Sequence, residues 1–84
     1  MEKSSFTREY KAFCRLLRKC REEHDVTQVQ LAQRLGETQS EISKFERGER
    51  RLDLVQLHKW CQAIGVRVSD FVQSFEDAIP TRRK

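Results

Sequence analysis

Apolar residues recur at helical spacing along most of the 84-residue chain, and polar residues fill the positions between them. Turn and cap residues interrupt this recurrence and divide the chain into five segments. We expect helices at about 7–23, 27–36, 39–47, 53–65 and 69–79, joined by short loops. No segment alternates with the period of a strand, and no internal repeat is visible. The pattern therefore predicts an all-α fold.

The expected helices carry start and stop signals in the sequence. A hydroxyl or carboxylate cap followed three residues later by Gln or Glu can form a capping box. Three such pairs occur: Thr27 with Gln30, Thr38 with Glu41, and Asp53 with Gln56. Ser69 is expected to cap the fifth helix after an extended connector at 66–68. Residues expected to end helices are Asp25, Gly36, Gly48, Gly65 and Pro80.

The same spacing predicts which side chains turn inward. The expected inward residues of the first three helices are Tyr10, Phe13, Cys14, Leu17, Arg21, Leu31, Leu35, Ile42 and Phe45. Those of the last two are Leu54, Leu57, Trp60, Cys61, Ile64, Phe71, Val72 and Phe75. One domain over 7–79 accounts for all of them, between a flexible lead at 1–6 and a basic tail at 80–84.

Composition narrows the classes of function only a little. The net charge of +4 and pI near 9.3 are compatible with a nucleic-acid partner without requiring one. No apolar run approaches the roughly 20 residues of a membrane span, and no signal peptide is visible. We therefore expect a cytoplasmic protein that does not engage a membrane. No nucleophile–base set or phosphate-cradling glycine loop occurs, so we expect neither an enzyme nor a cofactor.

The three cysteines, Cys14, Cys20 and Cys61, are odd in number and lie among helical residues. Reduced, buried thiols are the simplest interpretation. His58 and Cys61 are three residues apart on one expected helix, but paired Cys-x-x-Cys spacing is missing, so we expect no metal site. A redox or metal sensor stays open as an alternative, and it would require exposed thiolates.

Residues 27–48 are the most informative segment. Two short capped helices flank a tight turn at Gly36, and the second helix has a polar outer face. This is the layout that places side chains in the major groove of DNA.

The stretch from Leu17 to Phe71 resembles the Cro/cI-type (lambda-repressor-like, XRE) helix-turn-helix domains of phage repressors and their bacterial relatives. The resemblance is carried by Arg21, Thr27-Gln28, Leu31-Ala32, Leu35-Gly36, Ser40, Ile42-Ser43, Glu46-Arg47-Gly48, Leu54, Leu57 and Ala63 to Val66. The chain departs from the family pattern at Glu37, where an apolar residue is common, and at Leu52, where proline is common.

The resemblance implies a compact five-helix, lambda-repressor-like helix-turn-helix domain and a role for each of several residues. Base edges are expected to meet Gln39, Ser40, Ser43 and Lys44. Phosphates are expected to meet Gln28, Arg47, Arg50 and Arg51. Arg21 and Glu46 are expected to pair as a structural salt bridge. Self-association is expected to use Phe71, Phe75 and Ile79.

These roles predict a sequence-specific transcriptional regulator, most simply a repressor, that binds double-stranded DNA as a homodimer. A prophage regulator, a restriction–modification controller and an antitoxin with a toxin partner fit the sequence equally well. The competing class is a protein-interaction adaptor on the same fold. An adaptor should carry an apolar patch on the outer face of the third helix, whereas a DNA reader should carry polar residues there.

Overall fold

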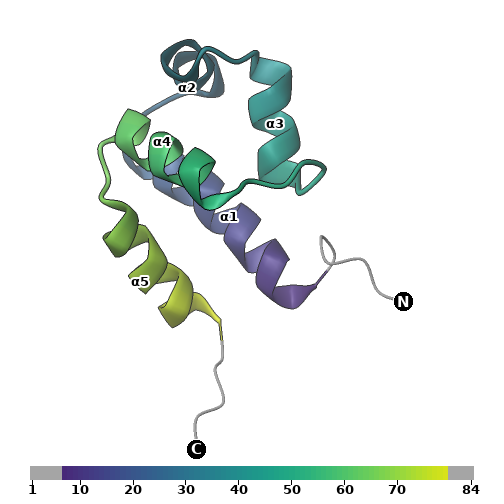
Figure 1. Cartoon of the computed structure of the whole chain (residues 1–84), viewed down its shortest axis with the longest axis vertical. Helices are drawn as coiled ribbons and strands as arrows, with labels where there is room; N and C mark the ends of the chain where they lie inside the picture. Colours follow the sequence, from purple (N-terminus) through teal and green to yellow (C-terminus); the bar gives the residue numbers. More distant parts are fainter. Residues whose placement is uncertain (1–6, 80–84) are drawn as a thin grey trace, which may run out of the picture.

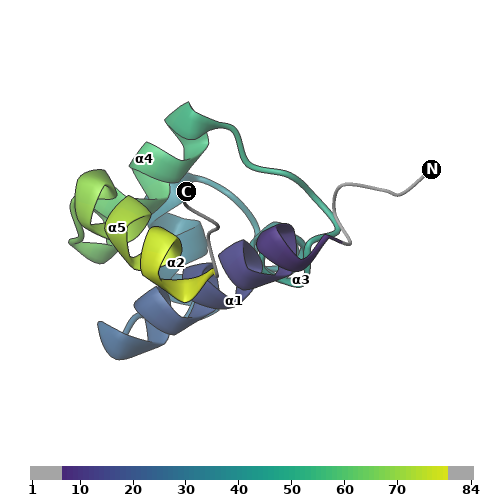
Figure 2. The same ribbon diagram turned by 90° about the horizontal axis from the view of Figure 1, so that it is seen from below.

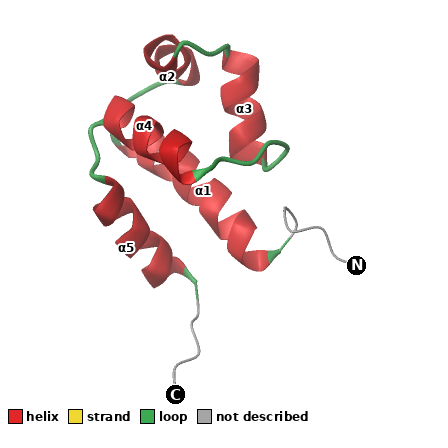
Figure 3. Cartoon of the chain, viewed as in Figure 1, coloured by secondary structure: helices red, strands yellow, loops and turns green. Residues whose placement is uncertain are grey.

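The computed structural model describes residues 7–79, and within that range it contains five helices and no strand (Figures 1 and 3). The helices are α1 (Arg8–Glu23), α2 (Gln28–Leu35), α3 (Gln39–Arg47), α4 (Leu54–Ile64) and α5 (Val68–Ala78). The expected all-α fold is therefore confirmed. The expected lead at 1–6, the tail at 80–84 and the stop at Pro80 lie outside the described residues.

The helices contact one another in a closed ring. α1 packs against α3 and α5, α2 packs against α3 and α4, and α4 packs against α5. Figure 2 shows α5 beside α1, with α4 above them. The ring encloses a core in which the largest fully buried side chains are Trp60, Phe71, Leu17, Leu31, Ile42 and Cys61. α3 packs chiefly on α1 and α2, and its Phe45 meets Trp60 of α4 edge-on, with 6.0 Å between the ring centres. Much of its remaining surface stays available to solvent.

Glycines end three of the helices, as expected. Gly36, Gly48 and Gly65 have φ of +69°, +80° and +98°, and the N–H of each bonds back to the carbonyls of its helix. The first helix ends in the same way without glycine. Asp25 takes φ +57°, and the N–H of Val26 donates to the carbonyl of Arg21 at 3.1 Å. Aspartate is one of the few residues that tolerate this conformation.

One start signal was assigned wrongly, and one expected capping box is incomplete. α5 begins at Val68 with Arg67 as its cap, and the Arg67 side chain makes no capping bond. The expected cap Ser69 lies inside the first turn, because the Arg67 carbonyl already accepts from the N–H groups of Asp70 and Phe71. At α3, Thr38 accepts from the N–H of Glu41 as expected, but the return bond of a capping box is missing. The other two boxes, at Thr27 and Asp53, are complete.

Leu54 and Val72 were both expected to turn inward, and both are exposed, whereas Phe71 is buried as expected. Leu54 is 69% exposed, because the preceding loop residue Leu52 packs against the core at this end of α4. Phe71 is only 2% exposed and stacks edge-on against Phe13 of α1. It therefore offers no surface for the self-association that we expected it to mediate. No helix within residues 7–79 has both the length and the apolar composition needed to cross a membrane.

Candidate nucleic-acid interface

The turn after α2 determines how α3 is presented. Gly36 reverses the chain, the N–H of Glu37 donates to the carbonyl of Ala32 at 2.9 Å, and Thr38 starts the next helix. α3 then buries Ile42 and Phe45 and turns its polar residues outward. Ala32 is itself buried, so its small side chain lies where the two helices approach. The result is a short polar helix standing at the edge of the molecule (Figure 1).

A buried ion pair fixes α3 against α1. The Arg21 Nε lies 2.6 Å from the Glu46 Oε2, and the Arg21 Nη2 lies 3.1 Å from the Glu46 Oε1. The two side chains are 8% and 4% exposed. Arg21 also donates from its Nη1 to the carbonyl of Val26 at 2.9 Å, which ties the pair to the loop before α2. The pair that the resemblance implies is thus present, with two-pronged geometry.

The same carboxylate starts a series of hydrogen bonds that ends on the outer face. The Gln28 Nε2 donates to the Glu46 Oε1 at 3.0 Å, and the Gln39 Nε2 donates to the Gln28 Oε1 at 3.2 Å. Gln28 is half-buried and Gln39 is exposed. The series leaves the amide oxygen of Gln39 and one of its N–H hydrogens outside these bonds. It therefore fixes the orientation of an exposed amide at the first residue of α3.

The other predicted base-contacting residues lie along the same helix. Ser40 is exposed next to Gln39, while Ser43 and Lys44 are half-buried one turn further along. The Lys44 Nζ lies 3.9 Å from the Glu41 Oε2. The Arg47 Nη1 donates to the Ser43 hydroxyl. The structure therefore gathers all four residues on one helix, with Ser43 and Lys44 already in contact with charged neighbours.

The predicted phosphate-contacting arginines all have intramolecular partners. Arg47 binds Glu49 through two contacts of 2.9 and 3.1 Å, and this hydrogen bonding lowers the pKa of Glu49. Arg50 pairs with Glu41 and lies over the ring of Phe45, 5.1 Å from its centre. These contacts hold the loop at 48–53 close to α3. Exposed pairs of this kind are weak, so the arginines can exchange them for other anions.

Arg51, in the same loop, contacts α1. Its guanidinium carbon is 4.2 Å from the ring centre of Tyr10 on α1. No local pattern in the sequence indicated this contact or the pairing of Glu41 with Arg50. Both depend on the path of a loop without regular structure. Spacing did indicate the buried Arg21, since a charged residue lay on an apolar stripe.

The three thiols are buried and unpaired with one another. Burial raises the pKa of Cys14 and Cys20, and it raises the pKa of Cys61 to about 11. These are the opposite of the exposed, ionised thiols that a redox sensor needs. Within residues 7–79, no group of three or more His, Cys, Asp or Glu side chains is arranged to hold a metal ion.

α2 and α3 are two capped helices joined by a glycine turn, and a buried ion pair fixes α3 against α1. This arrangement defines a helix-turn-helix domain. The family model described as Helix-turn-helix matches residues 17–71, and the chain belongs to this family. Those bounds coincide with the stretch on which the resemblance was based. A comparison with curated proteins gives no match.

Two solved structures are similar over most of their length. One is an XRE-family like protein from Pseudomonas syringae pv. tomato str. DC3000, 38% identical, with a TM-score of 0.77 over 86% of this chain and 88% of that chain. The other is the clp gene regulator ClgR from C. glutamicum, 25% identical, with a TM-score of 0.77 over 86% of this chain and 94% of that chain. Together with the family match, they support a DNA-binding transcription regulator of XRE type.

Proposed function

We propose that the chain is a sequence-specific transcriptional repressor that binds a two-fold operator as a homodimer. The observation that carries this proposal is the hydrogen-bonded series from Glu46 through Gln28 to Gln39. A glutamine amide can both accept from N6 and donate to N7 of adenine, and Gln39 retains one acceptor and one donor for this purpose. Because the series orients the amide before DNA arrives, less side-chain freedom is lost on binding.

The rest of α3 complements this contact. Lys44 can donate to the O6 and N7 of guanine, and Ser40 is a short, adaptable neighbour of Gln39. Ser43 is suited to a phosphate or a thymine methyl group. Phosphates are assigned to Gln28 and to the arginines that follow α3: Arg47, Arg50 and Arg51. Arg47 would leave an exposed ion pair with Glu49 for a phosphate, so little folding energy opposes that exchange. Arg50 and Arg51 would leave Glu41 and the ring of Tyr10.

A second copy is needed because one such domain makes too few contacts for tight specific binding. We assign the contact between copies to α5. Phe75 and Ile79 are half-buried, and Val72 is exposed in place of the buried Phe71. Val72 and Phe75 are one turn apart on one face of α5, and Ile79 follows directly after the helix as its C-cap.

Sedimentation of three variants tests this surface. Asp in place of Val72 or Ile79 should shift the chain toward monomer, since a carboxylate would be buried between the copies. Leu54→Asp is the matched control, because Leu54 is the most exposed large apolar residue outside α5. A dimer lost in Leu54→Asp and retained in Val72→Asp would move the interface to α4.

The exposed apolar residues favour a DNA reader over an adaptor. The large apolar side chains that are exposed within residues 7–79 are Val29, Leu54, Val55 and Val72, and none of them belongs to α3. The outer face of α3 therefore offers a protein partner no apolar contact area, whereas its amide, hydroxyl and ammonium groups suit base edges.

Selection from a pool of random duplex DNA tests the function directly. The proposal predicts enrichment of a two-fold sequence with half-sites about one helical turn apart. A reporter whose promoter overlaps the enriched site should be turned down when the protein is expressed. If no sequence is enriched, the proposal is refuted. If expression of the reporter rises, the protein is an activator and not a repressor.

A further inference from the structure

A polar hollow of about 340 Å³ lies where α1, α2 and α3 meet. Its lining residues are Arg18, Arg21, Gln28, Ser43, Glu46 and Arg47. Arg21 and Glu46 neutralise each other within it. The remaining charges of the lining are those of Arg18 and Arg47, whose partners Glu22 and Glu49 do not line the hollow, so its walls carry a positive excess. It also adjoins the reading residues, since Gln28 lines it and accepts from Gln39.

We propose that this hollow binds one phosphate of the DNA backbone and that Arg18 of α1 is one of its ligands. The inference rests on the proposed function, because it takes the phosphate from DNA. With this contact, α1 would touch DNA in addition to α2 and α3. Neither the spacing of residues nor the family resemblance assigned this role to α1. A guanidinium suits the site because its N–H groups match two phosphate oxygens at once.

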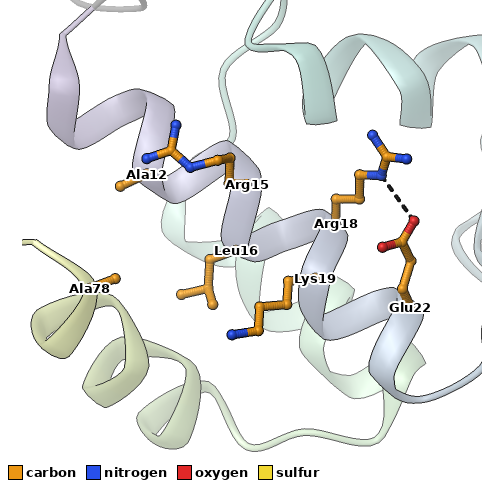
Figure 4. A pocket seen from close by; sticks show the side chains of 7 residues that line it. All are labelled: Ala12, Arg15, Leu16, Arg18, Lys19, Glu22 and Ala78. Atoms are coloured by element: carbon orange, nitrogen blue, oxygen red, sulfur yellow. Dashed lines mark hydrogen bonds and ion pairs between the residues drawn. The ribbon is translucent and has the colours of Figure 1, made fainter.

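Arg18 is available for this exchange. Its side chain is 66% exposed, and its partner is Glu22 on the same helix, at 2.9 Å from the Arg18 Nε to the Glu22 Oε2. Figure 4 draws this pair at a neighbouring hollow, which Arg18 and Glu22 line together with Lys19 and with Ala78 of α5. Such an exposed pair between neighbouring turns contributes little to stability, and phosphate competes with it well. Arg47 likewise forms an exposed ion pair, with Glu49, which a phosphate could displace.

The chain offers a matched control in the next residue. Lys19 is 68% exposed and lies 4.0 Å from Glu23, also one turn away. It points toward α5 (Figure 4), and it does not line the positive hollow. Arg18→Gln and Lys19→Gln thus remove the same charge from the same helix. Only the first removes it from the proposed site.

The experiment measures the affinity of wild type and variants for two duplexes, one enriched in selection and one unrelated, over a series of salt concentrations. Each phosphate contact contributes about 0.9 to the slope of log K against log salt. Arg18→Gln should lower the slope by about 0.9 per bound protomer on both duplexes, and Lys19→Gln should leave it unchanged. Glu22→Gln should raise affinity more than Glu23→Gln, because it frees Arg18 from its partner.

Other outcomes overturn the inference in distinguishable ways. If Arg18→Gln and Lys19→Gln changed the slope equally, Arg18 would contribute only through the net charge of the protein and not through a phosphate contact. The proposed function would remain intact. A wild type that binds no duplex would remove the proposed function and the inference with it. In a separate arm, the free protein is titrated with inorganic phosphate. If Arg18→Gln weakens that binding but leaves the DNA slope unchanged, the hollow is a site for free anions and not for DNA.

Discussion

Replacing Glu46 with alanine is predicted to be the most damaging single change on α3. The substitution removes two acceptors from Arg21, whose side chain is 8% exposed, and leaves it the Val26 carbonyl at 2.9 Å. It also removes the acceptor of the Gln28 amide. The buried guanidinium would then keep no counter-charge closer than the exposed Glu22 carboxylate, whose Oε2 lies 4.0 Å from the Arg21 Nη2.

The expected cost follows from the asymmetry of buried ion pairs. Removing one partner of a buried pair costs about 3–5 kcal/mol, since the other charge stays desolvated. Small domains have total stabilities of about 5–15 kcal/mol, so a large share would be lost. Glu46→Gln keeps one acceptor and the shape of the side chain, and we expect it to cost about 1–3 kcal/mol. The double variant Arg21→Met with Glu46→Leu removes both charges, and we expect it to stay near the wild type in stability.

Urea unfolding followed by fluorescence measures these differences, because Trp60 is the only tryptophan and is fully buried. Glu46→Ala should move the midpoint far below that of wild type, with Glu46→Gln between them. The double variant should fold yet bind DNA weakly, since Gln28 and Gln39 lose their anchor. An unchanged midpoint for Glu46→Ala would refute the assignment of the pair as the element that holds α3.

Three further predictions follow from other residues. Gly36→Ala should cost about 1–2 kcal/mol in unfolding free energy, purely from backbone strain, because φ is +69° and an added Cβ meets nothing within 4 Å; a neutral result would contradict the left-handed turn. In the same assay, Phe71→Ala should cost about 3–5 kcal/mol and Val72→Ala less than about 0.5 kcal/mol. If Val72→Ala cost more than Phe71→Ala, Phe71 would lie on the surface and Val72 in the core. Burial raises the pKa of Cys61 to about 11 from 9.0, so its contribution to stability is full below pH 9 and is lost as the pH rises toward 11. That loss is about 2–3 kcal/mol, and unfolding of Cys61→Ala should show less of it.

The sequence predicted the number, order and approximate ends of the helices because those depend on local chemistry. Capping residues, glycines at left-handed positions and apolar spacing each act within a few residues. Arg21 was also predictable, since a charge on an apolar stripe needs a partner. Within the described residues, the Helix-turn-helix match bears out the resemblance over the same 17–71 span.

The features that the sequence did not predict depend on contacts between residues that are distant in the sequence. Leu54 is exposed because Leu52 reaches the core first, and periodicity cannot rank two leucines beside a helix start. Phe71 and Val72 are adjacent and both apolar, so only the position of α1 decides which one is buried. Glu41 turns to Arg50 because the loop brings that arginine close, and no local rule predicts the path of a loop.

We propose that Glu46 and Gln28 orient Gln39 to read a base, and a double-mutant cycle of Gln28 and Gln39 tests this role. The affinity of wild type, Gln28→Ala, Gln39→Ala and the double variant is measured for the selected duplex and for a duplex changed at one base pair of each half-site. We expect Gln39→Ala to lose discrimination at one base pair, and we expect the two substitutions to be coupled by about 0.5–3 kcal/mol. Additive effects, with discrimination intact in Gln39→Ala, would contradict this role.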